Sequence, residues 1–295
     1  MLRGASPYLL LVLTPLFWSG NFVIGRAVHL QVPPLGLSFW RWLVACLILL
    51  PFGWGPLRRH WPVLRAHLPL MLVLAILGVA NFNTFVYLGL QTTTATNAVL
   101  LQSNIPVIIV GLAWLLLGEP VRPRQLMGIL FSLAGVLTLI TRGDPAVFRT
   151  LTLTTGDLWI LAAVASWALY SVLLRRRPPG LDPLGFLMFT VIVGVVVLAP
   201  FYLWESAGGR QMVLNGVTVA TVLYVAVFAS VLAYIFWNRA VAEVGPSRAG
   251  QFIHLMPVFG TTLSIIFLGE RLAAYHLVGA LLIVGGILFV SLRRR

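Results

Sequence analysis

Polar and aromatic side chains recur near the middle of long apolar segments, where they are suited to binding a small solute. Trp18 and Asn21 have the same i, i+3 spacing as Trp167 and Tyr170, which places each pair on one helix face. Polar groups in hydrocarbon are costly, so we expect them to face protein or a water-filled cavity. The candidates for lining a central substrate cavity are Trp18, Asn21, Asn83, Tyr87, Asn104, Trp167, Tyr170, Trp237, Gln251 and His254.

Each candidate also has a structural interpretation. A polar side chain in a membrane helix often only hydrogen-bonds a neighbouring helix, at about 0.6 kcal/mol in measured cases, and a buried tryptophan often only packs. Ser247, Gln251 and His254 form a stripe at i, i+4, i+7. His254 fits either a proton-linked switch or a neutral imidazole satisfied by a neighbouring helix. We favour a cavity because corresponding segments of two similar halves contribute to the set.

Catalytic and metal-binding patterns are absent from the sequence. It contains neither HExxH nor GxSxG, no cluster of His, Asp and Glu, and a single cysteine, Cys46. We therefore predict that the protein is not an enzyme and that it has no cofactor and no metal site.

The charged residues restrict the kind of solute. All seven acidic residues lie in loops or at segment ends, so no carboxylate is placed at mid-membrane to carry a proton or bind sodium. This disfavours a proton-coupled exchanger of cationic drugs and favours a net-neutral or zwitterionic substrate. Arg41, five residues into an apolar segment, is the one candidate for a buried cation. It could attract a substrate carboxylate, but we expect its side chain to extend to the outer interface.

The elements that position these residues are predicted to be membrane-spanning helices. Hydrophobic residues make up 60% of the chain and charged residues 9%, against roughly 25% charged in soluble domains. Apolar runs near the ~20 residues that cross a bilayer recur along the chain. The first run is retained as a span because it is too long for a signal peptide and lacks a cleavage site. Ten spans are predicted, at about 7–27, 36–54, 68–90, 95–118, 123–141, 157–174, 183–203, 217–238, 247–268 and 274–292, with loops at 55–67, 142–156 and 204–216.

The net charge of +13 indicates topology, because cytoplasmic loops of membrane proteins accumulate basic residues. All 20 basic residues are arginines, and most lie in the even-numbered loops and the two tails. The odd-numbered loops hold only Arg142, Arg149, Arg210 and Arg271, with Arg26 at an edge. We therefore predict both termini in the cytoplasm and no nucleic-acid partner.

Two passages 151 residues apart repeat one pattern. Proline, glycine and glutamate are costly inside apolar helices unless geometry requires them, so their recurrence predicts a duplication into residues 1–142 and 157–292. Five spans in each half place the second half in the opposite orientation, the inverted-repeat architecture of alternating-access transporters. The residues that align without a gap are Pro106, Gly118, Glu119, Gly128 and Gly135 with Pro257, Gly269, Glu270, Gly279 and Gly286.

The repeated residues also have expected local roles. Pro106 and Pro257 should kink spans four and nine, either as static bends that shape the cavity or as hinges during transport. Gly118 and Gly269 are expected to end their helices as C-caps. Glu119, in turn, is expected to pair with Arg122 or Arg124.

The pattern resembles the ten-span drug/metabolite transporter superfamily with paired EamA domains. The resemblance rests on a tryptophan early in each half (Trp18, Trp167), a proline in the middle of the fourth span and Leu-Gly-Glu at its end. It covers essentially the whole chain and is greatest to bacterial amino-acid exporters of the YddG type. It implies a basket of eight helices around a central cavity, with spans five and ten outside.

We therefore predict an all-α polytopic membrane protein of two inverted five-helix repeats that exports small metabolites, chiefly aromatic or varied amino acids, by alternating access. The bacterial inner membrane is its expected location, with the solute and membrane lipid as partners and a monomer or homodimer as the assembly. Facilitated diffusion and proton antiport both remain open. The alternatives are an exporter of other metabolites or drugs, or a channel or scramblase on the same fold. Nucleotide-sugar transport is disfavoured because only Arg41 is available to meet phosphate.

Overall fold

A computed structural model describes residues 5–28, 31–150, 152–268 and 272–291 of the protein. Over these ranges the chain forms helices joined by turns, without strands. The first half contains α1 Pro7–Ala27, α2 Pro34–Ala66, α3 Leu68–Ala75, α4 Phe82–Thr92, α5 Ala95–Gln102, α6 Ile105–Leu117 and α7 Pro123–Ile140. The second half contains α8 Thr155–Leu173, α9 Pro183–Ala207, α10 Gly216–Tyr224, α11 Ala233–Val244, α12 Pro246–Gln251, α13 Leu255–Leu268 and α14 Ala274–Ser291.

Several of these helices continue one another through short non-α segments. Two π-helical segments, Ile76–Asn81 and Val225–Leu232, join α3 to α4 and α10 to α11. When such joined segments are counted as one helix, eight of the described helices are long and apolar enough to cross a membrane. A shorter apolar helix, Ala274–Val290, corresponds to the predicted tenth span. The predicted ninth span is divided into α12, the 3₁₀ turn Phe252–His254 and α13. Spans nine and ten therefore stay predictions.

The predicted loop at 55–67 is wrong, because α2 continues through it to Ala66. Leu57 and Leu64 are buried on this extension, while Arg58 is exposed. An amphipathic face of this kind stabilises a helix by packing even where prolines interrupt its hydrogen bonds. At 1.5 Å per residue the 33-residue helix is about 50 Å long. It therefore exceeds the ~30 Å of hydrocarbon that a span must cross.

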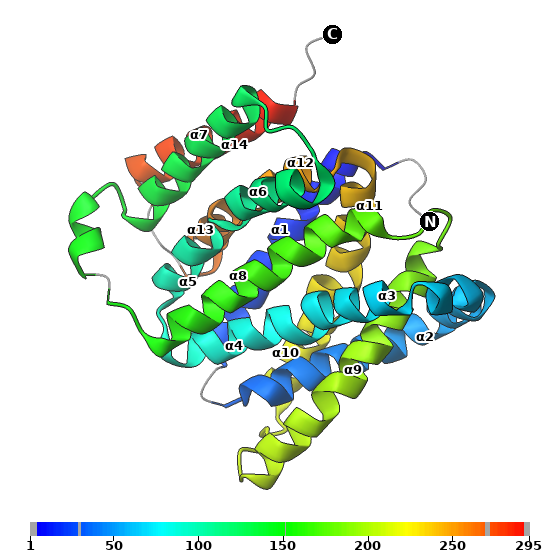
Figure 1. The fold of residues 1–295 in the computed structure, drawn as a ribbon. Helices are drawn as coiled ribbons and strands as arrows, with labels where there is room; N and C mark the ends of the chain where they lie inside the picture. Colours follow the sequence, from blue (N-terminus) through cyan, green and yellow to red (C-terminus); the bar gives the residue numbers. More distant parts are fainter. Residues whose placement is uncertain (1–4, 29–30, 151, 269–271, 292–295) are drawn as a thin grey trace.

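The glycines of the repeated passage bring α7 and α14 into close contact along one edge of the bundle (Figure 1). A Cβ atom on Gly128 would lie 2.7 Å from the carbonyl oxygen of Gly286, and one on Gly135 would lie 2.6 Å from that of Gly279. The earlier glycine of α7 meets the later glycine of α14 and the reverse, so the two helices are antiparallel, as inverted repeats require. Both pack chiefly against each other, which agrees with the outer position expected for spans five and ten.

The chain bends just before each repeated proline. Helix α5 ends at Gln102 and α6 begins at Ile105, so Pro106 lies in the first turn of a new helix, where no hydrogen bond is lost. Pro257 lies in the first turn of α13, directly after the 3₁₀ turn Phe252–His254. The predicted kink within a span is thus replaced at both prolines by a change of helix, because one helical segment ends before the proline and the proline lies in the first turn of the next.

Gly118 ends α6 as predicted, with a φ of +66° that other residues rarely adopt. Its N–H group donates to the carbonyl of Trp114, and the N–H group of Glu119 donates to that of Ala113. The corresponding Gly269 and Glu270 lie outside the described residues.

Gly285 and Gly286 offer a matched test of the α7–α14 contact. A Cβ on Gly286 would meet the Gly128 carbonyl oxygen at 2.5 Å, whereas nothing lies within 4 Å of one on Gly285. We expect Gly286→Ala to reduce the free energy of unfolding by about 1–3 kcal/mol through overpacking. Gly285→Ala should leave it unchanged or raise it, because alanine favours helix. Unfolding of the purified protein in detergent measures both, and equal stabilities would contradict this packing.

Candidate functional site

A buried arginine organises the centre of the bundle. Arg41, in the second turn of α2, is 0% exposed, and its guanidinium reaches acceptors on three other segments. Nη1 donates to the side-chain oxygens of Asn21 (3.2 Å) and Asn83 (2.8 Å) and to the Tyr87 hydroxyl (2.7 Å). Nε and Nη2 both donate to Ser230 Oγ, at 2.9 and 2.8 Å. The Tyr87 hydroxyl also donates to Asn21 at 2.6 Å, which closes the network.

The expectation that Arg41 extends to the membrane interface is wrong. Extension requires a lipid-facing side of the helix, whereas Arg41 lies on the side of α2 that packs against α4 and the π-helical segment Val225–Leu232. Four oxygen acceptors surround it there, and they offset part of the cost of burying a charge. The site therefore contains a fixed positive charge in addition to its amides and aromatic rings.

The two π-helical segments place polar groups around this charge. They occupy corresponding positions of the two halves, and π-helical turns free backbone carbonyls and occur often at functional sites. The carbonyl of Gly78, in the first segment, accepts a hydrogen bond from the Tyr234 hydroxyl. Tyr234 in turn accepts from Asn83 Nδ2 at 3.2 Å, which joins it to the arginine network. Ser230 belongs to the second segment, so both segments contribute.

Beside the arginine network lies a cluster of buried aromatic rings. The rings of Trp18 and Trp167 meet edge to face, with centroids 4.9 Å apart and an interplanar angle of 89°. Trp237 lies 5.5 Å from each of them, and Tyr234 lies 5.5 Å from Trp167. The edges and faces of such rings can bind apolar and aromatic parts of a solute. Tyr170 extends the cluster, and its hydroxyl donates to Asn238 at 2.7 Å.

His254 connects the two helix interruptions. Its Nε2 lies 2.9 Å from the carbonyl oxygen of Ser103, the residue 151 positions earlier and thus its counterpart in the first half. Its Nδ1 lies 2.6 Å from Ser132 Oγ on α7. With the proton on Nε2, the ring donates to Ser103 and accepts from Ser132. This is the arrangement of a neutral imidazole satisfied by neighbouring helices.

Two small cavities lie between these groups. One, of about 10 Å³, is lined by Trp18, Asn21, Phe82, Asn83, Gln102, Ile105, Trp167, Ile253 and Met256. The other, of about 20 Å³, is lined by Val99, Gln102, Ser103, Ile253, Met256 and Pro257, and it adjoins both interruptions. Each has room for about one water molecule. Neither of these two cavities can hold a small metabolite without widening.

Several donors facing this interior are without partners. Among the described residues, no hydrogen-bond acceptor meets Nε2 of Gln102 or Nε1 of Trp167, both of which line the smaller cavity. The same holds for Nε1 of Trp42 and of Trp237. A buried donor without a partner costs about 1–3 kcal/mol. These groups therefore favour a ligand or water that supplies acceptors.

The ten predicted cavity residues are distributed unevenly. Trp18, Asn21, Asn83 and Trp167 line the smaller cavity. Tyr87 contacts Arg41, Tyr170 and Trp237 join the aromatic cluster, and Gln251 and His254 are buried beside the interruptions. Asn104 is exposed, and its amide donates to the carbonyls of Leu100 and Leu101 in the preceding helix, α5.

The sequence-based selection left out residues that the structure brings to the centre. Arg41 was assigned to the interface, and Ser230, Tyr234 and Gln102 were not selected. One signal was available for Tyr234, because it is the counterpart of Asn83 at the repeat spacing of 151 residues. For Arg41, the signal was its charge within an apolar segment, which by itself indicates a functional site.

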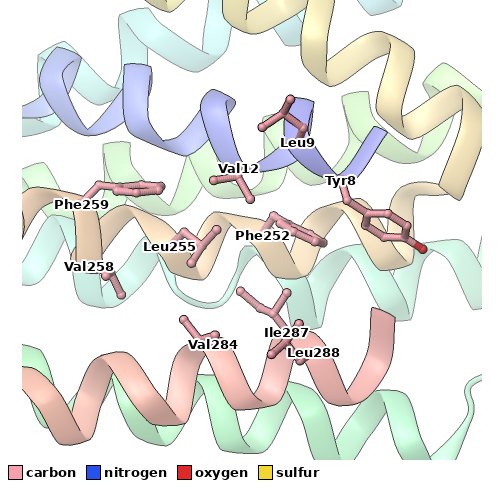
Figure 2. A pocket seen from close by; sticks show the side chains of 10 residues that line it. All are labelled: Tyr8, Leu9, Val12, Phe252, Leu255, Val258, Phe259, Val284, Ile287 and Leu288. Atoms are coloured by element: carbon pink, nitrogen blue, oxygen red, sulfur yellow. The ribbon is translucent and has the colours of Figure 1, made fainter. Parts of the chain in front are cut away.

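A larger groove of about 550 Å³ lies outside this centre, between α1, the start of α13 and α14 (Figure 2). Apart from the Tyr8 hydroxyl, the side chains that face it are hydrocarbon. It contains none of the ten predicted cavity residues. The lining residues are Tyr8, Leu9, Val12, Phe252, Leu255, Val258, Phe259, Val284, Ile287 and Leu288.

Hydrogen bonds join the two halves at the end that the arginine pattern assigns to the cytoplasm. Ser247 Oγ donates to Glu119 Oε2 at 3.0 Å, which fastens the turn after α6 to the start of α12. The predicted pairing of Glu119 with Arg122 or Arg124 is wrong, since no such ion pair forms in this part of the described chain. Arg176 also donates across the halves, to the carbonyl of Leu116.

At the opposite end, carboxylates of the second half accept hydrogen bonds from the first half. Glu205, near the end of α9, accepts a 2.8 Å hydrogen bond from the Gly36 N–H group at the start of α2. Asp157, in the first turn of α8, accepts from the hydroxyl of Thr93 and from the amide of Asn97 (3.4 Å). Polar contacts thus join the two halves at both ends of the bundle.

Duplicated apolar helices around a buried polar centre define a multi-pass membrane protein with an enclosed site. The chain belongs to the EamA-like transporter family, whose model matches residues 5–141 and again residues 154–292. It therefore consists of two EamA repeats and is a membrane transporter, consistent with the drug/metabolite transporter superfamily that the sequence pattern resembles.

Similar proteins support this assignment along the full length. The uncharacterized transporter YyaM of Bacillus subtilis (strain 168) is 30% identical, with 98% of this chain and 95% of that protein covered. A probable amino-acid metabolite efflux pump of Salmonella typhimurium (strain LT2) is 24% identical, with 94% and 92% covered. A solved crystal structure with 22% identity has a TM-score of 0.77 over 97% of this chain and 96% of the other, which shows a shared fold.

Ser132 tests the role of the His254 bridge. Ser132→Ala removes the partner of Nδ1 in a buried ring, so we expect the free energy of unfolding to fall by about 1–3 kcal/mol. Thr138→Ala on the same helix is the matched control, since its exposed hydroxyl bonds only the Ala134 carbonyl. That variant should stay within about 0.5 kcal/mol of the wild type. Denaturant unfolding in detergent gives both values, and an unaffected Ser132→Ala variant would contradict the bridge.

Proposed function

We propose that the protein is a secondary transporter that exports small metabolites, chiefly amino acids, across the bacterial inner membrane by alternating access. The observation that supports it most directly is the central site, which combines Arg41, the amides of Asn21 and Asn83 and a cluster of tryptophans. These groups match the carboxylate, the polar groups and the apolar side chain of an amino acid. The similarity to an amino-acid metabolite efflux pump agrees with this class of solute.

Alternating access is supported by the contacts that join the two halves at both ends of the bundle. The cavities of about 10 and 20 Å³ are too small for an amino acid, so a solute can enter only when one end opens. The bonds from Ser247 to Glu119 and from Gly36 to Glu205 each join the two halves. If the halves rock against each other, one set of bonds can break while the other persists.

Counterflow in proteoliposomes tests this function. We expect unlabelled phenylalanine inside the vesicles to accelerate uptake of labelled phenylalanine or of another amino acid in a panel, because a carrier returns faster when loaded. Trp167→Phe should lower the apparent affinity up to about tenfold, since it removes an unpartnered donor from the cavity wall. Trp159→Phe, on the membrane-facing side of the same helix, is the control.

Two results would contradict the proposal. Uptake without trans-acceleration indicates a pore, and flipping of labelled lipid without solute uptake indicates a scramblase. Equal affinities in Trp167→Phe and the wild type would mean that the solute binds elsewhere.

The two repeated prolines are proposed as hinges of this motion. Pro106 and Pro257 follow interruptions at which α5 meets α6 and the turn Phe252–His254 meets α13. Proline prevents the hydrogen bond that would join each pair into one continuous helix. The half-helices can then change their mutual angle at little cost.

Pro106→Ala and Pro257→Ala should therefore slow transport several-fold while solute affinity and stability change little, because alanine allows a continuous, stiffer helix. Initial rates of counterflow and solute affinities in detergent measure the two effects separately. Pro120→Ala, in the turn after α6, is the control. Unchanged transport rates in both hinge variants would show that the bends are static.

A further inference from the structure

The positive charge of Arg41 has no acidic partner in the part of the chain that the structure describes. Its acceptors are amide and hydroxyl oxygens. Carboxylates bond elsewhere: Glu119 to Ser247, Asp157 to Thr93, Glu205 to Gly36 and Glu243 to Arg239. Dipoles of neutral groups stabilise a buried cation only in part, and an ionised side chain in a membrane interior usually marks a binding site.

The hydrogen bonds of the guanidinium are also incomplete. Arginine has five N–H donors. The two on Nη1 are shared among three acceptors, while Nε and Nη2 both point to Ser230 Oγ. One N–H of Nη2 is left without an acceptor among the described residues. An added anionic oxygen would complete the set and supply the missing negative charge.

The smaller cavity adjoins two of the acceptors of this group. Asn21 and Asn83, which accept from Arg41, line it together with two unpartnered donors, Gln102 Nε2 and Trp167 Nε1. An anion in an opened cavity would accept from these donors and take over bonds that Arg41 now makes to the amides. The rest of that wall is apolar, with the rings of Trp18 and Phe82 beside the aliphatic side chains of Ile105, Ile253 and Met256, and it suits an apolar group attached to the anion.

We infer that Arg41 binds the carboxylate of the transported solute, so that the site selects organic acids, with or without an amino group, over their amides and amines. The inference rests on the proposed transport function and specifies its substrate class. A carboxylate carries one negative charge, which balances the single charge of Arg41, and its two oxygens match the guanidinium fork. A phosphate dianion would be left with an excess charge here.

Ligand-induced thermal stabilisation of the purified wild type in lipid nanodiscs tests this selection. The probes are phenylalanine, leucine and 3-phenylpropionate, each with its amide, together with phenethylamine and phenyl phosphate. We expect at least one acid to raise the unfolding temperature and to bind about tenfold or more tightly than its amide, because charge-assisted hydrogen bonds are lost in the amide. If no acid exceeds its amide, or if phenyl phosphate binds more tightly than every acid, the inference is overturned.

Variants of α2 separate binding by Arg41 from a structural role. Arg41→Gln should abolish the difference between acid and amide, and Arg41→Lys should keep the difference but weaken acid binding about tenfold, because lysine lacks the fork. Arg58→Gln, exposed on the same helix, should behave as the wild type. Arg41→Gln that folds and keeps the preference overturns the inference. If that variant does not fold, unchanged acid affinity in Arg41→Lys overturns it.

Counterflow on the same preparations distinguishes the two proposals. Transport of amides and acids at equal efficiency refutes selection by Arg41 and leaves the transport function intact. Selective binding of acids without any counterflow supports the site and refutes transport.

Discussion

The buried guanidinium of Arg41 is the interaction on which the centre of this protein depends. A charge at this depth is tolerated only when several oxygens converge on it, and here they come from α1, α4 and the π-helical segment Val225–Leu232. Because α1, α2 and α4 belong to the first half and Ser230 to the second, one side chain fixes the relative position of both halves. Apolar packing alone would not specify this relative position, since a helix in a membrane packs about as well against lipid tails as against leucine side chains.

The duplication explains why the centre is built as it is. Trp18 packs on Trp167, Asn83 donates to Tyr234 and His254 bonds the carbonyl of Ser103, and the members of each pair occupy matching positions of the two halves. A residue can contact its own counterpart only close to the axis that relates the copies. These pairs therefore mark that axis. Where the partners differ, as asparagine and tyrosine do, the copies have diverged, and these asymmetric positions give the site its chemical character.

Much of the architecture was predictable, and the main error at the central site has an identifiable cause. The apolar runs, the C-cap at Gly118 and the interruptions near Pro106 and Pro257 follow from local physics that hydrophobicity and backbone geometry express directly. Arg41 was assigned to the interface, and Asn104 lies exposed outside the buried cluster. Depth in the membrane is visible in a sequence, whereas the direction of a side chain around its helix depends on tertiary packing. The π-helical segments further change the directions in which side chains point around the helix. Their amino-acid composition does not distinguish them from α-helix.

The energetic contrast between the centre and the ends bears on how such a protein moves. Each contact between the halves at the ends is a hydrogen bond, and water can bond its donor and acceptor once it breaks. A bond of that kind contributes only about 0.5–1.5 kcal/mol net. By contrast, the glycine contacts of α7 with α14 and the enclosed network of Arg41 cannot be exposed without leaving cavities or an unpaired charge in hydrocarbon. Separating the two halves therefore requires least free energy at either end and most in the middle of the bundle. In the proposed cycle of alternating access, the contacts at one end would break while α7 and α14 stay paired, and a bound solute would replace the bonds that Arg41 gives up.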